Sequence, residues 1–259
     1  MRSGEIKSAL VDLNAGNPQG SVLSPLLFLI YVNDIPDDPL GQVSKTQFAD
    51  DMANIATDRN QNRVKIRLQK SLNLLEEWCC KWRVKLNAAK SQLILLGSKN
   101  TTNFSLFLFG QEIFPQQEAT LLGFTFDRKM TMKHQVCNIQ TKVNKRLGLL
   151  KMLRGKGWGA NPQTLLKLYK SYIRPVIDYG SILTAGCAPI QMKKLQILQN
   201  KALRIVLSLP RHTPIRELHQ LCNIEMISDR LQKLKQDSLQ RFGESKLMQD
   251  LAKETIHFQ

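Results

Sequence analysis

Alternating apolar and polar blocks divide the first part of the chain into short elements. The apolar run PLLFLIYV (25–32) follows a turn and predicts a buried helix that ends near Asp34, before Pro36. Two apolar runs at 43–49 and 52–57 flank a pair of aspartates, so a β-hairpin is expected there. Further strands are predicted at residues 5–13, 91–97, 104–109 and 120–126.

Helical spacing of apolar residues marks several longer segments. Between residues 62 and 86 they recur every three or four positions, with Arg and Lys on the other face. After residue 130 the chain becomes helical and basic, with one apolar stripe made by Val136, Ile139, Val143, Leu147 and Leu150. Asn161 is expected to cap a helix that has Pro162 in its first turn. The inward residues predicted for that helix are Leu165, Leu168, Tyr169 and Tyr172, and another helix is predicted at 190–209.

The net charge of the chain and its distribution indicate the class of binding partner. The 259 residues carry a net charge of +16, and 42% of them are hydrophobic, enough for a real core. Residues 1–60 hold 4 Lys/Arg and 8 Asp/Glu, a net charge of −4, so the remainder carries +20. This asymmetry favours nucleic acid as partner, and a solvated basic surface is the alternative.

Cysteine content and targeting signals indicate the compartment. Five cysteines without a CxxC pair are typical of a reduced, intracellular protein, for which nucleus and cytoplasm are expected. The start of the chain has no signal-peptide pattern. Its apolar runs fall short of the ~18 residues that a membrane span needs, so no membrane association is predicted.

The candidate chemistry lies in the segment TQFADDMANIA (46–56). Asp50 and Asp51 are adjacent carboxylates inside an apolar, β-prone run, where charge is costly and the two groups repel each other. A bound cation would repay that cost. The alternative is an Asp-Asp hairpin turn that binds no metal.

Four segments, in order, carry a resemblance to a known family. They are GNPQGSVLSPLLFLIYVNDIP (16–36), FADD (48–51), WCCKWRVKLNAAKSQLILLG (78–97) and LLGFTFD (121–127). Together they resemble motifs B, C, D and E of the reverse transcriptases of LINE-type, jockey-like non-LTR retrotransposons. LYKSYIRPVIDYGS (168–181) resembles the thumb-side segment of the same enzymes.

The resemblance implies an α+β fold, the C-terminal half of a polymerase palm followed by an all-helical thumb. Residues 1–130 would form the partial palm with motifs B to E, and residues 131–259 the basic thumb and C-terminal region. The implied function is RNA-directed DNA polymerase, with two Mg²⁺ ions held by Asp50 and Asp51. An RNA template, a DNA primer and a dNTP would be its partners.

The resemblance also assigns roles to smaller segments. It places Pro18, Gln19, Gly20 and Ser21 under the templating base and the incoming nucleotide, where an ordinary turn is the alternative. Lys90 matches the motif D lysine that protonates the departing pyrophosphate, and a surface lysine is its alternative. Leu122, Gly123 and Phe124 match the primer grip, and plain strand core is the alternative.

Motif A and the fingers of the family lie upstream of GNPQGS, and Asp12 is too close to Gly16 to be the motif A aspartate. We therefore expect an upstream polymerase half and an endonuclease outside this chain, and no activity from this chain alone. One rival hypothesis is a catalytically inactive nucleic-acid-binding remnant. Another is a group II intron maturase, which usually has Gly in place of Ser21.

Overall fold

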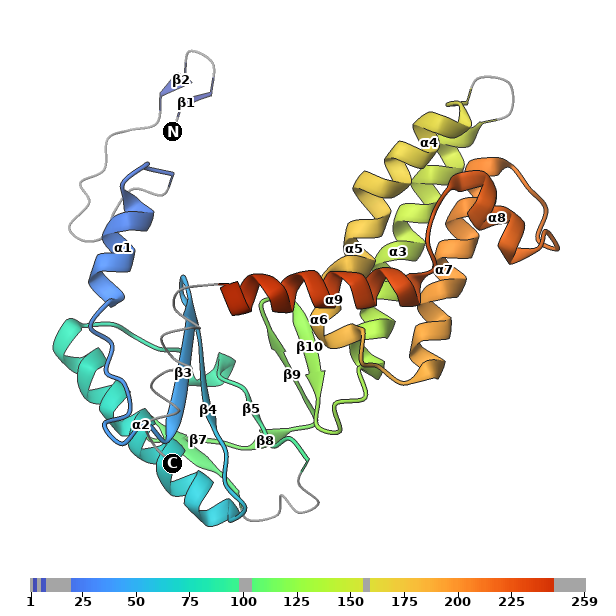
Figure 1. Cartoon of the computed structure of the whole chain (residues 1–259). Helices are drawn as coiled ribbons and strands as arrows, with labels where there is room; N and C mark the ends of the chain where they lie inside the picture. The colour runs from blue at the N-terminus through green and yellow to red at the C-terminus, as the bar shows by residue number, and fades with distance from the viewer. Residues whose placement is uncertain (1, 4–5, 8–19, 98–103, 156–158, 245–259) are drawn as a thin grey trace. The chain divides into compact units, whose positions relative to one another are not determined.

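The computed structural model places the chain in two compact units (Figure 1). Residues 1–91 and 103–114 belong to unit 1, and residues 92–102 and 115–259 belong to unit 2. The structure describes residues 2–3, 6–7, 20–97, 104–155 and 159–244. Its mixture of helices and small sheets agrees with the predicted α+β class. The division at residue 130 into palm and thumb stays a prediction.

Unit 1 combines antiparallel strand pairs with helices. The pairs are β1 (Arg2–Ser3) with β2 (Ile6–Lys7), β3 (Val43–Phe48) with β4 (Asp51–Ala56), and β6 (Leu106–Leu108) with β7 (Gln111–Ile113). The helical elements are α1 (Ser24–Val32), α2 (Gln61–Trp82) and the 3-10 turn η1 (Ala88–Lys90). Of the strand predicted at 5–13, residues 6–7 form β2, and residues 8–13 lie outside the described residues.

The hairpin of β3 and β4 confirms the prediction for the Asp pair. Its register runs from Val43 opposite Ala56 to Phe48 opposite Asp51, which leaves a two-residue turn. The helix α2 packs against this hairpin. A small core joins them, made by Val32, Ile35, Leu75, Trp78 and Cys79 with Met52 and Leu72 against it.

The helix α1 forms as predicted, but the prediction that it is buried is wrong. Of its residues only Val32 is buried, and Ile30 is 65% exposed. The helix is apolar on every side, whereas the described part of unit 1 offers it few contacts. Tyr31 makes edge contacts with the rings of Trp78 and Trp82 and donates its hydroxyl hydrogen to the Trp82 carbonyl.

Unit 2 begins with two small strand pairs. The strand β5 (Leu93–Ile94) runs parallel to β8 (Pro115–Gln116), and β9 (Glu118–Leu121) runs antiparallel to β10 (Phe124–Asp127). The single strand predicted at 120–126 is therefore wrong. Leu122 and Gly123 have φ of 49° and 73°, so they form a tight turn that reverses the chain.

The helices of unit 2 pack around one apolar core (Figure 1). They are α3 (Lys133–Arg154), α4 (Pro162–Leu168), α5 (Arg174–Asp178), α6 (Ser181–Thr184), α7 (Pro189–Leu207), α8 (Ile215–Cys222) and α9 (Ile227–Glu244). The predicted stripe of α3 is buried at all five positions, which confirms it. None of the described helices has an apolar stretch long enough to cross a bilayer.

A π-helical turn, η2 (Tyr169–Ile173), links α4 to α5. The Asn161 side chain accepts a hydrogen bond from the Thr164 N–H at 2.8 Å, so the predicted cap is confirmed. The prediction that Tyr172 faces inward is wrong, because the π turn adds a residue and brings Ile173 into the core instead. The ring of Tyr172 lies against the Arg146 guanidinium at 4.3 Å.

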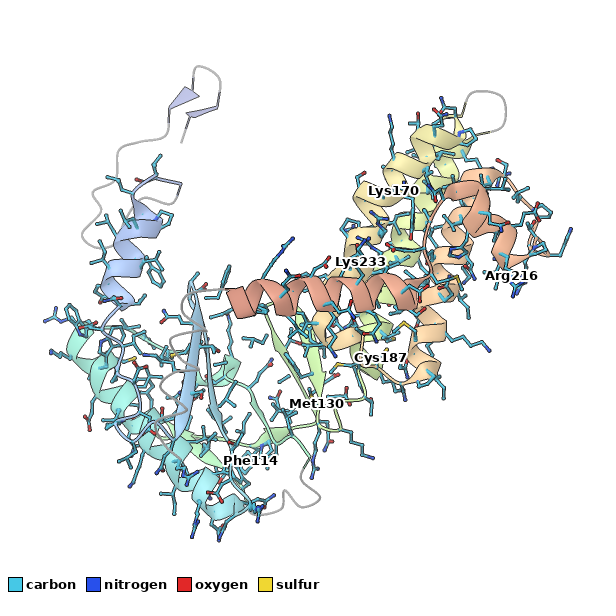
Figure 2. All side chains as sticks on the ribbon, viewed as in Figure 1. Phe114, Met130, Lys170, Cys187, Arg216 and Lys233 are labelled. Carbon is cyan, nitrogen blue, oxygen red and sulfur yellow. The ribbon has the colours of Figure 1, made fainter. Side chains whose placement is uncertain are left out.

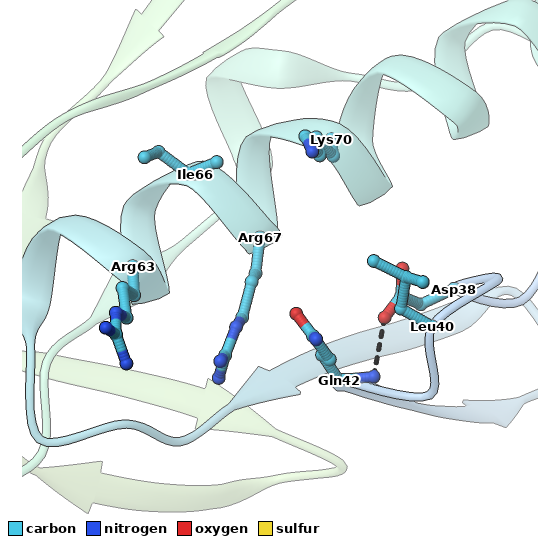
Figure 3. Close-up of a pocket in the computed structure, with 7 residues that line it drawn as sticks. All are labelled: Asp38, Leu40, Gln42, Arg63, Ile66, Arg67 and Lys70. Carbon is cyan, nitrogen blue, oxygen red and sulfur yellow. Dashed lines mark hydrogen bonds between the residues drawn. The ribbon is translucent and has the colours of Figure 1, made fainter.

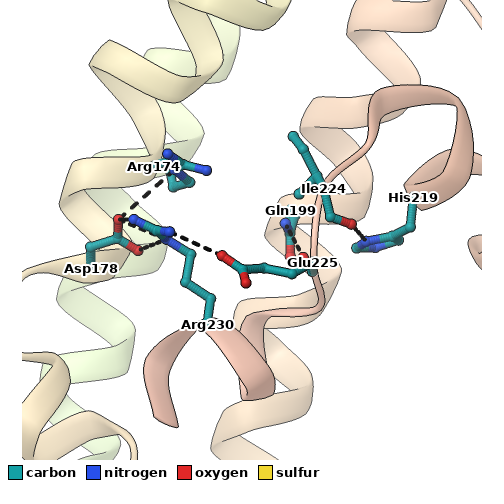
Figure 4. Close-up of polar contacts among 7 residues, drawn as sticks. All are labelled: Arg174, Asp178, Gln199, His219, Ile224, Glu225 and Arg230. Carbon is teal, nitrogen blue, oxygen red and sulfur yellow. Dashed lines mark hydrogen bonds and ion pairs between the residues drawn. The ribbon is translucent and has the colours of Figure 1, made fainter. Parts of the chain in front are cut away.

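An ion-pair cluster fixes the start of α9 to α5 (Figure 4). The Arg230 guanidinium donates to both carboxylate oxygens of Asp178, at 2.7 to 3.0 Å, and to Glu225 at 3.0 Å. The hydrogen bond from Arg230 to Asp178 is the main reason why the pKa of Arg230 lies above its usual value. Because both partners are largely shielded from solvent, this pair determines where α9 begins to pack.

Candidate active site

Asp50 and Asp51 lie at the tip of the β3–β4 hairpin, in unit 1. Ala49 has φ 52° and Asp50 follows it in the turn, so the hairpin places both carboxylates at its end. Both aspartates are exposed, and neither carboxylate makes a hydrogen bond or ion pair within the described residues. Asp50 belongs to the turn, and Asp51 is the first residue of β4. The tip thus presents two unneutralised carboxylates to solvent.

The donor chemistry of this tip suits a hard divalent cation, because Mg²⁺ prefers carboxylate oxygens. Across the described part of the chain, no three His, Cys, Asp or Glu side chains gather into a group that could hold a metal ion. Asp50 and Asp51 fit as part of a magnesium site, since they are two adjacent ligands with free oxygens. A complete site needs further ligands.

The turn before α1 lies partly within the described residues. Gly20 has φ +86°, a left-handed conformation that glycine adopts without strain. The Ser21 hydroxyl accepts a hydrogen bond from the Leu23 N–H at 3.4 Å. Pro18 and Gln19 lie outside the described residues, so the predicted nucleotide-binding turn stays a prediction.

Lys90 ends the 3-10 turn η1 in unit 1. Its backbone N–H donates to the Asn87 carbonyl at 3.0 Å and to the Asn87 side chain, which fixes the turn. The side chain is exposed, and its ammonium group has no hydrogen-bonding or ionic partner among the described residues. Lys90 therefore has a positioned backbone and a free charged end.

The β9–β10 turn in unit 2 holds the residues predicted for the primer grip. Leu122 is 43% exposed at its tip, whereas Phe124 is 5% exposed and packs against the Phe126 ring at 5.0 Å between centroids. The Tyr179 hydroxyl donates to the Leu122 carbonyl. A Cβ on Gly180, which has φ +70°, would lie 2.5 Å from the Phe124 ring.

Tyr179 and Gly180 lie in the thumb-side segment, and the sequence pattern predicts no individual role for either residue. The structure shows that they hold the β9–β10 turn from the end of α5. A glycine next to an aromatic residue, just after a helix, was the available signal. It indicates a close approach between chain segments but does not identify the partner.

Asp127 anchors α3 to the end of β10. Its carboxylate accepts hydrogen bonds from the N–H and hydroxyl of Thr131 at 2.8 and 2.9 Å and from the Met132 N–H at 2.8 Å. Burial raises the pKa of Asp127, but these donors outweigh burial and leave the pKa below its usual value. The charged form of Asp127 therefore stabilises the folded state.

We expect Asp127→Asn to lower the free energy of unfolding by about 2 kcal/mol at pH 7, because an amide accepts these bonds more weakly. A depressed pKa contributes stability above the unfolded value near 4, and that stability is lost as the pH falls through the folded value. The variant should therefore lose less stability than the wild type on acidification. Urea unfolding followed by circular dichroism at several pH values measures both effects.

The exposed Glu112 on β7 supplies the control, since Glu112→Gln should leave the acid limb of the stability curve unchanged. Parallel stability curves for Asp127→Asn and the wild type between pH 6 and 3 would contradict the role assigned to Asp127.

Several basic side chains on the helices of unit 2 are exposed, among them Lys170, Arg216 and Lys233, which Figure 2 labels. On α3, Lys142, Lys145, Lys151 and Arg154 are exposed, and Lys170 on η2 is exposed as well. Arg146 is half-buried, because it stacks on Tyr172 and donates to the Tyr172 carbonyl. These charges form a surface that can neutralise phosphates.

Comparison with known proteins finds a family model that matches part of the chain. Residues 5–126 match the family model described as reverse transcriptase (RNA-dependent DNA polymerase). The chain is 27% identical over 92% of its length to the RNA-directed DNA polymerase from mobile element jockey of Drosophila melanogaster. It is 24% identical over 88% of its length to the Drosophila funebris protein of the same name.

A third relative is the probable RNA-directed DNA polymerase from transposon X-element of Drosophila melanogaster, 25% identical over 86% of this chain. The chain spans only about a quarter of the length of these relatives, 26%, 26% and 25% in turn. No solved structure matches the chain. Residues 5–126 therefore belong to the reverse transcriptase family, and similarity to the RNA-directed DNA polymerases of jockey and other non-LTR elements extends over most of the chain.

Proposed function

We propose that this chain is the part of an RNA-directed DNA polymerase that carries its paired aspartates, and that it copies RNA into DNA within a longer protein. The observation that carries the proposal is the pair Asp50 and Asp51 at an exposed hairpin tip, inside a reverse transcriptase domain. Both carboxylates are free to bind a ligand. Residues 1–130 would act as partial palm and residues 131–259 as thumb.

Asp50 and Asp51 would hold two Mg²⁺ ions, with Asp50 as direct ligand and Asp51 in support. Bound Mg²⁺ supplies positive charge for the attacking 3′ oxygen and the leaving pyrophosphate. Lys90 has an ammonium free to donate a proton to that pyrophosphate. The turn at Pro18–Ser21 would bind the nucleotide and template.

Leu122, Gly123 and Phe124 would support the primer strand. The buried Phe124 and the bond from Tyr179 give their turn a fixed shape, which suits a positioning role. The exposed basic residues of α3 would contact the backbone of the template–primer duplex.

An inactive nucleic-acid-binding remnant is the second candidate. It is favoured by one observation, that no third acidic group joins the aspartates within the described residues. Such a protein would bind duplex but would not extend a primer, even beside an upstream polymerase half. Primer extension therefore separates the two candidates.

Duplex binding tests the part that both candidates share. The 259-residue chain should bind an RNA–DNA duplex with little sequence preference. Lys142→Gln, Lys145→Gln and Lys151→Gln together should make the slope of log affinity against log salt shallower by about 2.7, because each phosphate contact contributes about 0.9. Fluorescence anisotropy between 50 and 200 mM salt, about the range in which such contacts weaken strongly, measures the slope.

A matched triple variant, Lys129→Gln with Lys201→Gln and Lys233→Gln, removes the same charge elsewhere on unit 2. It should change the slope less than the α3 variant does. Equal slopes for the two triple variants would show that the α3 charges act only through the overall charge of the protein.

A further inference from the structure

A pocket of about 220 Å³ lies in unit 1, between the first turns of α2 and the turn that precedes β3 (Figure 3). Leu40 and Ile66 give it apolar walls, and both are more than half exposed. Its polar lining includes Gln42, Arg63, Arg67 and Lys70. We refer to it as the α2 pocket.

The cations of the α2 pocket are only partly neutralised. Arg67 forms an ion pair with Asp58 at 2.9 Å and donates to the Thr57 carbonyl at 3.2 Å, which fixes its guanidinium. Arg63 and Lys70 are exposed and have no hydrogen-bonding or ionic partner among the described residues. Three cations (Arg63, Arg67 and Lys70) against two carboxylates (Asp38 in the lining and Asp58 beside it) leave the α2 pocket with a net charge of about +1.

The one carboxylate in the lining already accepts hydrogen bonds from the backbone. An oxygen of Asp38 accepts hydrogen bonds from the Gln42 N–H at 2.6 Å and the Val43 N–H at 3.1 Å, and so closes the turn before β3. Asp58 lies beside the pocket. The Asn60 N–H, followed by the charges of Arg67 and Arg63, holds its pKa below the usual value. Neither aspartate forms an ion pair with Arg63 or Lys70.

Helix stability does not account for these cations. Residues 61–70 of α2 contain four basic residues and no acidic one. Arg63 lies in the first turn of α2, where the helix dipole opposes a cation at a cost of about 0.3–1 kcal/mol. Basic residues that destabilise the helix on which they lie are expected where those residues bind a ligand.

The α2 pocket is separate from the aspartate tip. Gln42 precedes β3 and Arg63 follows β4, so the pocket lies at the open end of the hairpin, whereas Asp50 lies at its turn. Six-residue strands put about 17 Å between these ends. An anion bound in the pocket is therefore not the nucleotide that the aspartates would bind.

We propose that the α2 pocket binds the phosphates of a single-stranded nucleic acid. Arg63 and Arg67 extend in the same direction from neighbouring turns of α2 (Figure 3), and a guanidinium can donate two parallel hydrogen bonds to one phosphate. Lys70 follows Arg63 at about 10 Å along the helix axis, so the cations are spread over about two turns of the same helix. A polymer with repeated charge satisfies both cations, and its sugars and bases can pack on Leu40 and Ile66.

The test measures the binding of labelled 12-nucleotide single-stranded RNA and DNA to the whole 259-residue chain. The double variant Arg63→Gln with Lys70→Gln should weaken binding about tenfold and make the salt slope shallower by about 1.4, since each phosphate contact on a single strand contributes about 0.7. An effect on RNA alone identifies the template strand as ligand, and an effect on both identifies the phosphate backbone.

Two controls keep the result interpretable. Lys81→Gln combined with Lys85→Gln removes one charge from the last turn of α2 and one from the segment that follows the helix. This variant should leave the salt slope unchanged. Arg63→Lys with Lys70→Arg keeps both charges and should keep the salt slope of the wild type, because the number of neutralised phosphates sets that slope. Circular dichroism confirms that each variant folds.

Equal slopes for the Arg63/Lys70 variant and the Lys81/Lys85 variant would overturn the proposal. It would also be overturned if the Arg63/Lys70 variant kept its RNA and DNA affinity but lost binding to a peptide of Glu and Leu, because the ligand would then be an acidic protein segment. Asp50→Ala should leave single-strand binding intact, so this test succeeds or fails independently of the polymerase proposal.

Discussion

Replacing Asp50 with alanine is expected to lower primer extension by ~10³-fold or more, about 4 kcal/mol in the transition state. The assay uses a polypeptide in which this chain follows an upstream reverse transcriptase segment from a related element, with an RNA template, a DNA primer and Mg²⁺. Asp50 lies in the hairpin turn with free carboxylate oxygens, so the variant would lose the group proposed as the direct metal ligand.

The chain by itself is expected to show no extension under the same conditions. Two adjacent carboxylates provide only part of the oxygen ligands that two Mg²⁺ ions require, and the described residues supply no third acidic group beside them. Gel analysis of the extended primer measures both results.

Asp37→Ala is the control for this experiment. Asp37 is 82% exposed and pairs with Lys45 at 2.8 Å, away from the hairpin tip, so its loss should leave extension within about twofold, as for a surface ion pair. Extension by the isolated chain that survives in Asp50→Ala would show that the reaction centre lies elsewhere.

Gly180→Ala is expected to lower the free energy of unfolding by about 3 kcal/mol. Its Cβ would lie 2.5 Å from two atoms of the Phe124 ring, and φ of +70° disfavours any L side chain. Phe124 is buried, so its ring has little room to move away. Urea unfolding followed by circular dichroism measures the change.

Gly148→Ala is the matched control, because nothing lies within 4 Å of its Cβ position in α3. This variant should be unchanged or up to about 1 kcal/mol more stable, since alanine favours a helix. Phe124→Leu combined with Gly180→Ala should cost less than the sum of the single changes, because the smaller side chain relieves the clash. Strict additivity would rule the contact out as the cause.

The sequence predicted elements well where one face of the element is buried against its neighbours. The stripe of α3 and the β3–β4 hairpin were both predicted, because periodic burial leaves a periodic pattern. The apolar run of α1 predicted a helix correctly, but it did not predict that the helix is exposed. The apolar residues of a helix show only that its surface tends to be buried. They do not show whether a partner is present.

Turns were the weaker part of the prediction. Leu122 and Gly123 lie in an apolar run that reads as one strand, but positive φ at both residues makes a hairpin turn. Leucine rarely adopts that conformation, so the residue types in this run do not indicate a turn. The position of Asp50 in a turn was predicted, whereas the contact of Tyr179 with Leu122 joins residues 57 positions apart and leaves no local pattern.

The π turn at Tyr169–Ile173 makes the spacing of its segment as important as the identity of its residues. It adds one residue to a helical path, and removing that residue would rotate everything after it by about 100° around the axis. Asp178 would then point away from Arg230, and α9 would lose the contact that fixes its start. Substitutions in this segment act locally, but a one-residue insertion or deletion changes the docking of an entire helix.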